Sequence, residues 1–235
     1  MSYLILGSGG LGGALAHELA SRGEEWLLAG RQLPKGLDPA CYFPLQEVDP
    51  LSFDALFTLY DTATLPNVVI NTIGLLHDLS HMPERRVEEV TPQWLGESLQ
   101  ANAWPHLALG ASLSRLMTFE SRLWLCTLSD LAGSLGEAHR EPARRYSYRM
   151  SKAALNMGSR ILAAEWAERF PGAGVITVHP GLMDTPMQQP FRQEIDPALL
   201  QDPALVAPLL LDLLASLNQA HSGRFVDLRG QPLPW

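Results

Sequence analysis

The chain has 235 residues, of which 46% are hydrophobic and 18% charged, and this composition fits one globular domain spanning residues 1–235. A formal net charge of −8 argues against nucleic acid or an anionic membrane as a partner. The two cysteines, Cys41 and Cys126, are too few for a disulfide framework and lack metal-ligand spacing, so we expect no metal site and a cytoplasmic setting. The N-terminus lacks the basic start and the length of a signal peptide. The most apolar late segment, 206–217, carries Asp212 and is too short to span a bilayer, so we expect a soluble protein.

Short apolar runs alternate with longer helical patterns along most of the chain. The predicted strands lie at 3–6, 26–30, 42–48, 66–74, 122–129, 174–181 and 222–228, and the predicted helices at 12–23, 51–60, 92–117 and 146–169. Strands that are apolar throughout and alternate with helices indicate a parallel sheet covered on both faces. The sequence therefore predicts a single-domain Rossmann fold, a doubly wound α/β sheet of about seven strands. Segments 75–91 and 182–203 are predicted loops, and long loops often serve as lids or binding segments.

A glycine-rich turn joins the first predicted strand to the first predicted helix. Its GxGxxG pattern falls at Gly7, Gly9 and Gly12. Glycines let the backbone turn sharply and approach a pyrophosphate, and the following helix N-terminus favours negative charge. The pattern predicts a dinucleotide site formed by Gly7, Ser8, Gly9, Gly10, Leu11 and Gly12. The alternative is a tight turn that binds nothing.

The end of the second predicted strand bears on the choice between NAD and NADP. Gly30 and Arg31 stand where a binder of NAD would usually present Asp or Glu to the ribose 2′-hydroxyl. A guanidinium there can pair with a 2′-phosphate, which favours NADP(H) over NAD(H). The alternative for Arg31 is a solvated surface arginine. Asp49, after the third strand, either accepts a bond from the adenine amino group or caps the next helix, a role for which Ser52 competes.

The predicted helix that starts at residue 146 opens with YSYRMSK, an unusually polar beginning. Tyr148 and Lys152 are four residues apart and therefore lie on one face of a helix. A lysine ammonium beside the phenol would lower its pKa from about 10, which suits a group that gives a proton to a carbonyl or takes one from an alcohol. A Y-x-x-x-K spacing is common by chance, but here it lies between the fifth and sixth strands of a nucleotide-binding pattern.

In this context the sequence resembles the short-chain dehydrogenase/reductase family over nearly its whole length. The features that carry the resemblance appear in the family's order: the glycine turn 7–13, NTIG at 71–74, Asn102, Ser129, the pair Tyr148 and Lys152, and HPGLMDT at 179–185. The string YSYRMSKAALNM and the closing LPW look most like the subgroup of C-factor-like and Sniffer-like carbonyl reductases.

The resemblance implies roles for individual residues. Tyr148 would be the general acid/base, and Lys152 would bond the nicotinamide ribose. Asn102 would hold a water that links the lysine to solvent, and the alternative is a polar residue that kinks its helix. Asn71 and Gly74 would shape the floor of the cofactor site. The remaining implied cofactor contacts follow the sixth strand, at Pro180, Gly181 and Thr185, and the alternative for Thr185 is a cap on the next segment.

The sequence departs from the family at the end of the fifth strand. Many members have Ser-Ser there, and the second serine bonds the substrate oxygen, whereas this chain has Ser129 followed by Asp130. A carboxylate facing the substrate would disfavour the negative charge that develops on its oxygen during reduction. We therefore expect Ser129 to be the donor and Asp130 to point elsewhere, with Ser134 as a second candidate.

These residues predict an NADP(H)-dependent oxidoreductase that moves a hydride between nicotinamide and a carbonyl or alcohol substrate. Its substrate would be a small or medium hydrophobic compound held by segments 75–91, 131–147 and 182–203. The resemblance also implies a homodimer or homotetramer. One alternative is a non-catalytic NADP-binding regulatory or signalling protein, which would not need the tyrosine–lysine pair. Another is a sugar-nucleotide epimerase or dehydratase, which would need a larger C-terminal substrate domain than the remaining chain supplies.

Overall fold

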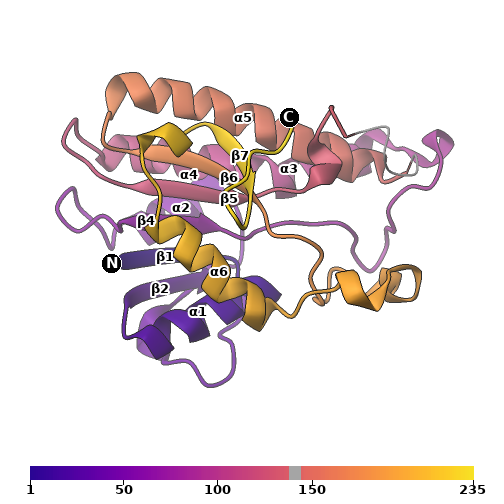
Figure 1. Ribbon diagram of the computed structural model, residues 1–235, viewed down its shortest axis with the longest axis horizontal. Coiled ribbons are helices and arrows are strands. Elements are labelled where there is room, and N and C mark those ends of the chain that lie inside the picture. The colour runs from indigo at the N-terminus through magenta and orange to yellow at the C-terminus, as the bar shows by residue number, and fades with distance from the viewer. Residues whose placement is uncertain (138–143) are drawn as a thin grey trace.

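The computed structural model, which describes residues 1–137 and 144–235, contains one sheet of seven parallel strands in the order β3-β2-β1-β4-β5-β6-β7 (Figure 1). The strands span Ser2–Leu6 (β1), Glu25–Gly30 (β2), Tyr42–Pro44 (β3), Val68–Asn71 (β4), Trp124–Leu128 (β5), Gly174–His179 (β6) and Arg224–Asp227 (β7). The order reverses between β1 and β4, and a crevice at such a switch point is where open α/β sheets bind ligands. The predicted doubly wound Rossmann fold is confirmed.

Alternate residues of β1 enter two separate cores, one on each face of the sheet. Tyr3 and Ile5 pack against helices α1 (Gly10–Arg22) and α6 (Pro203–Ala215). Leu4 and Leu6 lie in the core shared with α2 (Pro50–Phe57), α4 (Trp104–Leu116) and α5 (Tyr146–Arg169). Both faces of the strand are therefore buried, which is why its residues are apolar without alternation. Figure 1 shows α1 and α6 on one side of the sheet and α2, α4 and α5 on the other.

Two helical segments differ from the prediction. The helix expected over 92–117 is two helices, α3 (Pro92–Asn102) and α4, which meet at Ala103. Pro105, in the first turn of α4, has no N–H to donate and its ring disfavours a continuous helix. The apolar segment 206–217, for which no element was predicted, lies mostly in α6, whose side chains Val206, Leu210 and Leu214 are buried against the sheet. Among the helices of the described residues, none is long and apolar enough to span a membrane.

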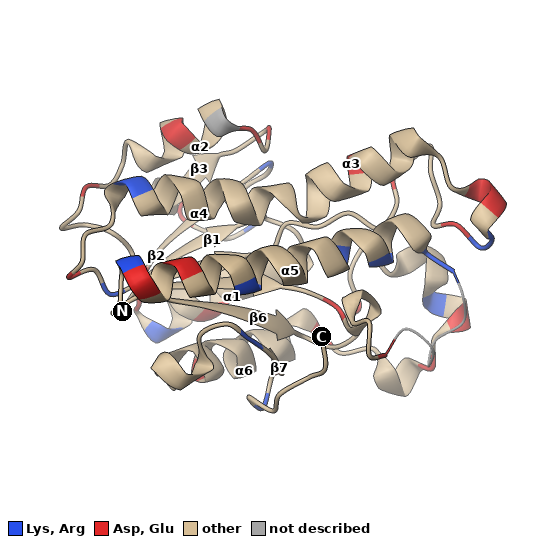
Figure 2. Ribbon diagram, turned by 90° about the horizontal axis from the view of Figure 1, so that it is seen from above, with Lys and Arg blue, Asp and Glu red and all other residues tan. Residues whose placement is uncertain are grey.

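The two predicted loops lie beyond the carboxyl ends of the strands, at the right of Figure 1. Segment 75–91 contains one 3-10 turn, Val87–Glu89, and segment 182–203 contains two, Gln189–Glu194 and Pro197–Leu199. Seen from above, α5 runs beside α3 and α4 and brings its first turn toward these loops (Figure 2). The polar start of α5 therefore lies at the edge of the sheet where the loops gather.

Candidate active site

A cavity of about 600 Å³ opens at the switch point between β1 and β4. It is bordered by the turn after β1, the end of β2, the segment before α2, the turn after β4 and one face of α3. Its lining includes Gly7, Ser8, Gly9, Gly30, Arg31, Asp49 and Gly74. All of these except Gly30 belong to the set of residues expected from the sequence to hold a dinucleotide, with Arg31 and Asp49 at its adenosine end. The lining therefore fits the predicted site.

The glycine turn is shaped by close backbone contacts. Gly7 has a φ of +97°, a conformation that favours glycine. A methyl group on Gly12 would lie 1.8 Å from the carbonyl oxygen of Gly7, so only glycine fits there. Gly9 caps α1 with no side-chain hydrogen bond, and a methyl group on it would meet no atom within 4 Å. The turn thus leaves an open cradle at the first N–H groups of α1, which suits a pyrophosphate.

Gly10 and Leu11 do not face this cavity. A methyl group on Gly10 would lie 2.6 Å from the side chain of Thr185, so this glycine leaves room for the segment after β6. Leu11 is buried in the core beneath α1. Of the six turn residues predicted to hold the cofactor, Gly7, Ser8 and Gly9 line the cavity, while Gly10, Leu11 and Gly12 shape the turn behind it.

Two residues predicted to contact the adenosine part of the cofactor, Arg31 and Asp49, line the same cavity. Arg31 is exposed there, directly after β2. The Asp49 carboxylate accepts the backbone N–H of Ser52 at 2.7 Å and caps α2. This bond holds the pKa of Asp49 below its usual value. Of the two roles predicted for Asp49, capping of the next helix is the one observed. Ser52 does not cap the helix but donates the backbone N–H that Asp49 accepts.

Tyr148 and Lys152 lie on one face of α5, both nearly fully buried. The Lys152 ammonium is 5.7 Å from the centre of the Tyr148 ring and donates to the carbonyl oxygen of Leu128 at 3.1 Å. Burial lowers the pKa of Lys152 to about 8, and the Asp130 carboxylate partly opposes this effect. The two residues line a narrow cleft of about 90 Å³, which shares Thr72, Ile73 and Gly74 with the cofactor cavity.

Asn102, at the end of α3, is fully buried beside this cleft. Its side chain accepts the N–H of Leu75 and donates to the Leu75 carbonyl, both at 2.8 Å, and it also donates to Ser151 at 2.9 Å. A methyl group on Gly74 would lie 3.3 Å from Asn102 Oδ1 and 3.6 Å from Lys152 Nζ. Gly74 therefore keeps open the space in which the asparagine and the lysine approach each other.

Asn71 supports the site from behind. It is buried at the end of β4, donates to Thr127 at 3.2 Å and accepts the N–H of Ile73 at 3.1 Å. These bonds fix the turn that presents Thr72, Ile73 and Gly74 to both cavities. Asn71 itself lines neither, and Thr72 and Ile73 are lining residues that the sequence reasoning did not name.

The expectation that Asp130 points away from the site is wrong. Tyr148 donates its hydroxyl hydrogen to Asp130 Oδ2 at 3.0 Å. The hydroxyl of Ser129 instead donates to Asn156 at 2.6 Å, on the buried face of α5. Ser134, the second candidate, is buried and accepts the N–H of Glu137. At the end of β5 the aspartate, and not either serine, presents its polar group beside the tyrosine.

The other oxygen of Asp130 fixes the position of the side chain. Oδ1 accepts the N–H of Ala132 at 3.0 Å and so caps the 3-10 turn Leu131–Gly133. His179 Nδ1, at the end of β6, lies 3.9 Å from the same oxygen. Burial alone would raise the pKa of Asp130, but His179, the Ala132 N–H, Arg145 and Lys152 together hold it below its usual value. Asp130 is therefore ionised at neutral pH.

His179 is a site residue to which the sequence analysis gave no role beyond its place at the start of HPGLMDT. Its ring lines the cleft with Tyr148 and Lys152, and Nδ1 is buried with no hydrogen-bond partner among the described residues. The sequence signal that could have indicated a site role is the position of His179 directly before Pro180-Gly181, at the carboxyl end of a strand of the parallel sheet.

The turn after β6 closes the other side of the cleft. Pro180, Gly181 and Thr185 all line it, as expected for contacts of the nicotinamide end. Gly181 has a φ of +82°, and the Thr185 N–H is bonded to the Met183 carbonyl. These turns bring Thr185 against Gly10, so the segment after β6 packs on the glycine turn.

Glu84 anchors the start of α5 from the loop after β4. Its buried carboxylate accepts the backbone N–H of Ser147 at 3.2 Å and also the Ser147 hydroxyl. The carbonyl of Glu84 accepts the N–H of Arg145, whose φ of 62° is left-handed. The carboxylate thus satisfies the free N–H of Ser147 at the helix start, and the Glu84 backbone carbonyl satisfies that of Arg145. No local pattern in the sequence indicates this contact.

A second cavity, of about 230 Å³, adjoins the cleft at Asp130. Its apolar wall comes from both long loops and contains Leu76, Pro83, Leu182, Phe191 and Ile195. Its charged residues are Asp130, Arg85, Arg144, Arg145 and Glu194, of which Glu194 pairs with Arg85 and Arg144. Segments 75–91 and 182–203 are therefore pocket walls as predicted. From the predicted wall 131–147, residues 138–143 lie outside the described part of the chain.

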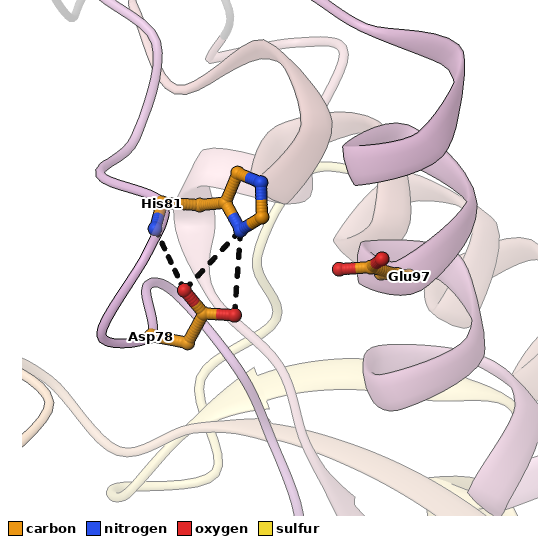
Figure 3. A group of neighbouring side chains, drawn as sticks. All are labelled: Asp78, His81 and Glu97. Carbon is orange, nitrogen blue, oxygen red and sulfur yellow. Dashed lines mark hydrogen bonds and ion pairs between the residues drawn. The ribbon is translucent and has the colours of Figure 1, made fainter.

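Three potential metal ligands come together among the described residues, although no metal was expected, and one of them, Glu97, also lines the cavity at the switch point. Asp78, His81 and Glu97 bring one ligand atom each within 4.8 Å of the others (Figure 3). The Asp78 carboxylate already accepts the N–H groups of Ser80 and His81 and faces His81 Nδ1, so the loop residues form a closed turn. The His81 ring stacks on Trp94 with 4.6 Å between ring centres. These contacts explain the arrangement without an ion.

Comparison with known proteins supports the fold. No protein-family model matches the chain. The chain superposes on the carbonyl reductase Sniffer of D. melanogaster with a TM-score of 0.81 and 22% identity, covering 100% of this chain and 99% of that one. It matches an NADPH-bound carbonyl reductase from chicken fatty liver with a TM-score of 0.79, 21% identity and coverage of 100% and 98%. A short-chain dehydrogenase/reductase from Burkholderia multivorans with bound NADP gives a TM-score of 0.76, 23% identity and coverage of 100% and 99%.

One curated relative is also similar in sequence. The C-signal protein of Myxococcus xanthus is 40% identical over 90 residues, which are 38% of this chain and 49% of that protein. The match thus spans about half of the relative's length. Together these likenesses establish that the chain has the Rossmann-type fold of the short-chain dehydrogenases/reductases, the fold that the sequence resemblance implied.

Proposed function

We propose that the protein is a short-chain dehydrogenase/reductase that uses NADP(H) to interconvert a carbonyl compound and its alcohol. One observation carries this proposal: the hydroxyl of Tyr148 and the ammonium of Lys152 are buried together in a cleft between the glycine-turn cavity and a second, loop-lined cavity. A dinucleotide bound at the first cavity and a small molecule in the second would meet at these two side chains.

The cofactor, when bound, supplies the hydride, and the protein binds and orients both reactants. Gly7, Ser8 and Gly9 would hold the pyrophosphate at the N-terminus of α1. Arg31 would pair with the 2′-phosphate, which supports NADP(H) over NAD(H). Thr185 and Lys152 border the cleft where the nicotinamide end would lie.

Tyr148 would exchange the proton. In reduction, its hydroxyl gives a proton to the substrate oxygen, and in oxidation the phenolate takes one from the alcohol. Lys152, if protonated, would stabilise the phenolate that remains after reduction. Asn102 would place a water near Lys152, because its amide lies beside the space that Gly74 leaves open.

The second cavity supports a substrate of modest size. Its volume of about 230 Å³ and its largely apolar wall suit a small or medium hydrophobic carbonyl compound. Its charged residues are mostly paired with each other through Glu194, which leaves the apolar wall as its main recognition surface.

Titration with NADPH and NADH, followed by a screen of carbonyl substrates, tests the proposal. We expect tighter binding of NADPH, and turnover that Tyr148→Phe lowers by about 10²- to 10⁴-fold without weakening cofactor binding. Failure to bind either nucleotide would contradict the cofactor assignment. Unchanged turnover in Tyr148→Phe would contradict the mechanism.

A non-catalytic, NADP-binding signalling protein is the second candidate. The similarity of 90 residues to C-signal is the observation that favours it. Nucleotide binding without turnover of any carbonyl or alcohol, with full biological activity in Tyr148→Phe, would support this alternative.

We also propose that the protein forms a homodimer or homotetramer. Apolar side chains stand exposed on α5, at Met150, Met157 and Ile161, and on α4, at Trp104 and Leu107. Such a surface suits a contact between copies of the chain. Sedimentation velocity on the wild type and on Ile161→Glu tests this, since the charge should dissociate an assembly that uses α5.

A further inference from the structure

The Tyr148 hydroxyl has a single hydrogen to donate, and Asp130 accepts it. The bond runs from the hydroxyl to Asp130 Oδ2 at 3.0 Å. In the proposed reduction the same hydrogen must point to the oxygen of the substrate, so the bond to Asp130 has to break. Among the described residues, Tyr148 is the one hydrogen-bond donor to Oδ2. The carboxylate therefore loses this donor whenever a substrate is positioned for reaction.

The Asp130 carboxylate is held in place and cannot turn to another donor. Oδ1 accepts the N–H of Ala132 at 3.0 Å, and the side chain is only 17% exposed. His179 Nδ1 also faces Oδ1, at 3.9 Å, and not Oδ2. Burial would raise the pKa of Asp130, but nearby positive charges and the Ala132 N–H hold it below its usual value, so the group is ionised at neutral pH. A largely buried charged oxygen without a donor is costly, so Oδ2 favours a substrate that brings one.

Asp130 lies where the catalytic cleft meets the loop-lined cavity. It lines both, and the other residues common to the two linings are Leu182 and Gln188. A substrate whose carbonyl faces Tyr148 and whose remaining atoms fill the loop-lined cavity must therefore cross this boundary. The atoms next to the reacting carbonyl then lie beside Asp130.

We propose that Asp130 selects α-hydroxy carbonyl compounds, in which the hydroxyl next to the carbonyl donates to Oδ2 while the carbonyl oxygen accepts from Tyr148. This proposal rests on the proposed carbonyl reduction and names the substrate class of that site. Oxygens on neighbouring carbons are about as far apart as the Tyr148 hydroxyl and Asp130 Oδ2, so one substrate can meet both groups. The rest of the substrate is apolar, to match the wall formed by Leu76, Leu182 and Phe191.

The charges of the loop-lined cavity favour a neutral hydroxyl over an ammonium as the donor. Three arginines and two carboxylates line this cavity: Arg85, Arg144, Arg145, Asp130 and Glu194. Arg145 acts electrostatically on the Asp130 carboxylate as well. Asp130 would attract an ammonium, but the arginines would repel it. A hydroxyl satisfies Oδ2 without adding charge.

Asp130 stays ionised throughout this reaction and transfers no proton. The carbonyl carbon gains the hydride that the bound cofactor supplies, and the carbonyl oxygen gains the proton of Tyr148. The neighbouring hydroxyl keeps its hydrogen, so the product is a vicinal diol. In the oxidation direction, Tyr148 takes the proton of one hydroxyl of the diol, and the other hydroxyl donates to Asp130.

Ketones of matched size test the selection. α-Hydroxyacetophenone and propiophenone differ by a hydroxyl in place of a methyl group at the carbon that should face Asp130. With NADPH, the wild-type kcat/KM should be at least about 10²-fold higher for the hydroxy ketone, since a site built around a substrate hydroxyl rejects the analogue that lacks it. α-Methoxyacetophenone has the same electron-withdrawing oxygen but no hydrogen to donate, and it should be as poor as propiophenone. Equal values for the hydroxy and methoxy ketones overturn the proposal, and a preference for α-aminoacetophenone overturns the choice of a neutral donor.

Asp130→Ser removes the charge and keeps a side chain that can cap the turn Leu131–Gly133. This variant should reduce propiophenone faster than the wild type does, and its preference for the hydroxy ketone should fall to about tenfold or less. Asp38→Ser is the matched control, because Asp38 caps the turn Pro39–Cys41 in the same way, through the Ala40 N–H, and lines neither cavity. It should keep the wild-type preference. The wild-type preference in a folded Asp130→Ser protein overturns the proposal.

A binding experiment separates this proposal from the proposed function. In Tyr148→Phe, Asp130 Oδ2 has lost the tyrosine donor, so the NADPH complex of this variant should bind α-hydroxyacetophenone at least about tenfold more tightly than propiophenone. Isothermal titration measures both affinities without turnover. Equal affinities overturn the pairing with Asp130. Preferential binding of the hydroxy ketone in a wild type that reduces none of these ketones would support the pairing and contradict the proposed reduction.

Discussion

Glu84 accepts hydrogen bonds from both the backbone N–H and the hydroxyl of Ser147, although 63 positions separate the two residues in the chain. Ser147 precedes Tyr148, so the loop after β4 holds the first turn of the helix that carries both proposed catalytic residues. One buried carboxylate thus anchors the start of the helix on which the proposed catalysis depends.

Glu84→Ala should weaken the start of α5. It leaves the buried Ser147 donors unsatisfied, and we expect the free energy of unfolding to fall by about 1–3 kcal/mol. We also expect kcat to fall more than KM rises, because Tyr148 loses its fixed position. Urea unfolding and steady-state kinetics measure the two effects.

Glu88→Ala is the control for this prediction, since Glu88 is exposed on the same loop. It should change neither stability nor kcat. Glu84→Gln keeps an acceptor and should be affected less than Glu84→Ala. Equal stability of Glu84→Ala and the wild type would show that the anchor contributes nothing.

Gly9 and Gly12 should respond differently to alanine. A methyl group on Gly12 would lie 1.8 Å from the Gly7 carbonyl oxygen, so Gly12→Ala should lower the thermal midpoint. A methyl group on Gly9 meets no protein atom within 4 Å, and its φ of −72° suits alanine, so Gly9→Ala should fold normally. If Gly9 faces a pyrophosphate, the variant should still bind NADPH more weakly. Fluorescence titration that shows unchanged affinity in a folded Gly9→Ala protein would contradict the assignment of the phosphate cradle.

The elements that depend on local pattern could be predicted from the sequence. The buried strands, the glycine turn and the positions of Tyr148 and Lys152 follow from runs of residues within one element. The break at Ala103 was missed because the long apolar pattern of 92–117 outweighed the effect of Pro105. Helix α6 was missed because its segment is apolar on most sides and so shows little periodicity.

The site residues could be predicted where a single helix or strand fixes the direction of the side chain. They could not be predicted where hydrogen-bond partners on different elements compete for the side chain. Ser129 and Asp130 follow one strand, and their directions depend on which partner each finds. The Ser129 hydroxyl donates to Asn156 on α5. Asp130 Oδ1 accepts the N–H of Ala132, and this bond turns Oδ2 toward the Tyr148 hydroxyl. The contact of Glu84 with Ser147 depends on the path of a long loop, for which the sequence has no periodic signal.

Arg31 should determine the preference between NADPH and NADH. A charge-assisted pair with the 2′-phosphate contributes about 1.5–3 kcal/mol, so Arg31→Ala should weaken NADPH binding by at least about tenfold and leave NADH binding nearly unchanged. Isothermal titration with both nucleotides measures the ratio of their affinities. Arg86→Ala, a change at an exposed arginine outside the cofactor cavity, is the control. If Arg31→Ala left the ratio of NADPH to NADH affinity at the wild-type value, Arg31 would be a solvated surface arginine with no part in cofactor selection.

Lys152 should make the stability of the cofactor-free protein depend on pH in the alkaline range. Its pKa falls from 10.5 to about 8 on folding, chiefly through burial, which corresponds to about 3 kcal/mol. Between these values the unfolded chain binds more protons than the folded one, so the free energy of unfolding should gain a rising contribution from pH 8 to about 10.5. Below pH 8 the buried ammonium bears its full desolvation cost. Lys152→Met removes the titrating group, so the stability of the variant relative to the wild type should be greatest below pH 8 and decrease above it. Urea unfolding from pH 7 to 10 measures this difference, with Lys35→Met, at an exposed lysine, as the control. A difference between Lys152→Met and the wild type that stays constant over this range would contradict the lowered pKa.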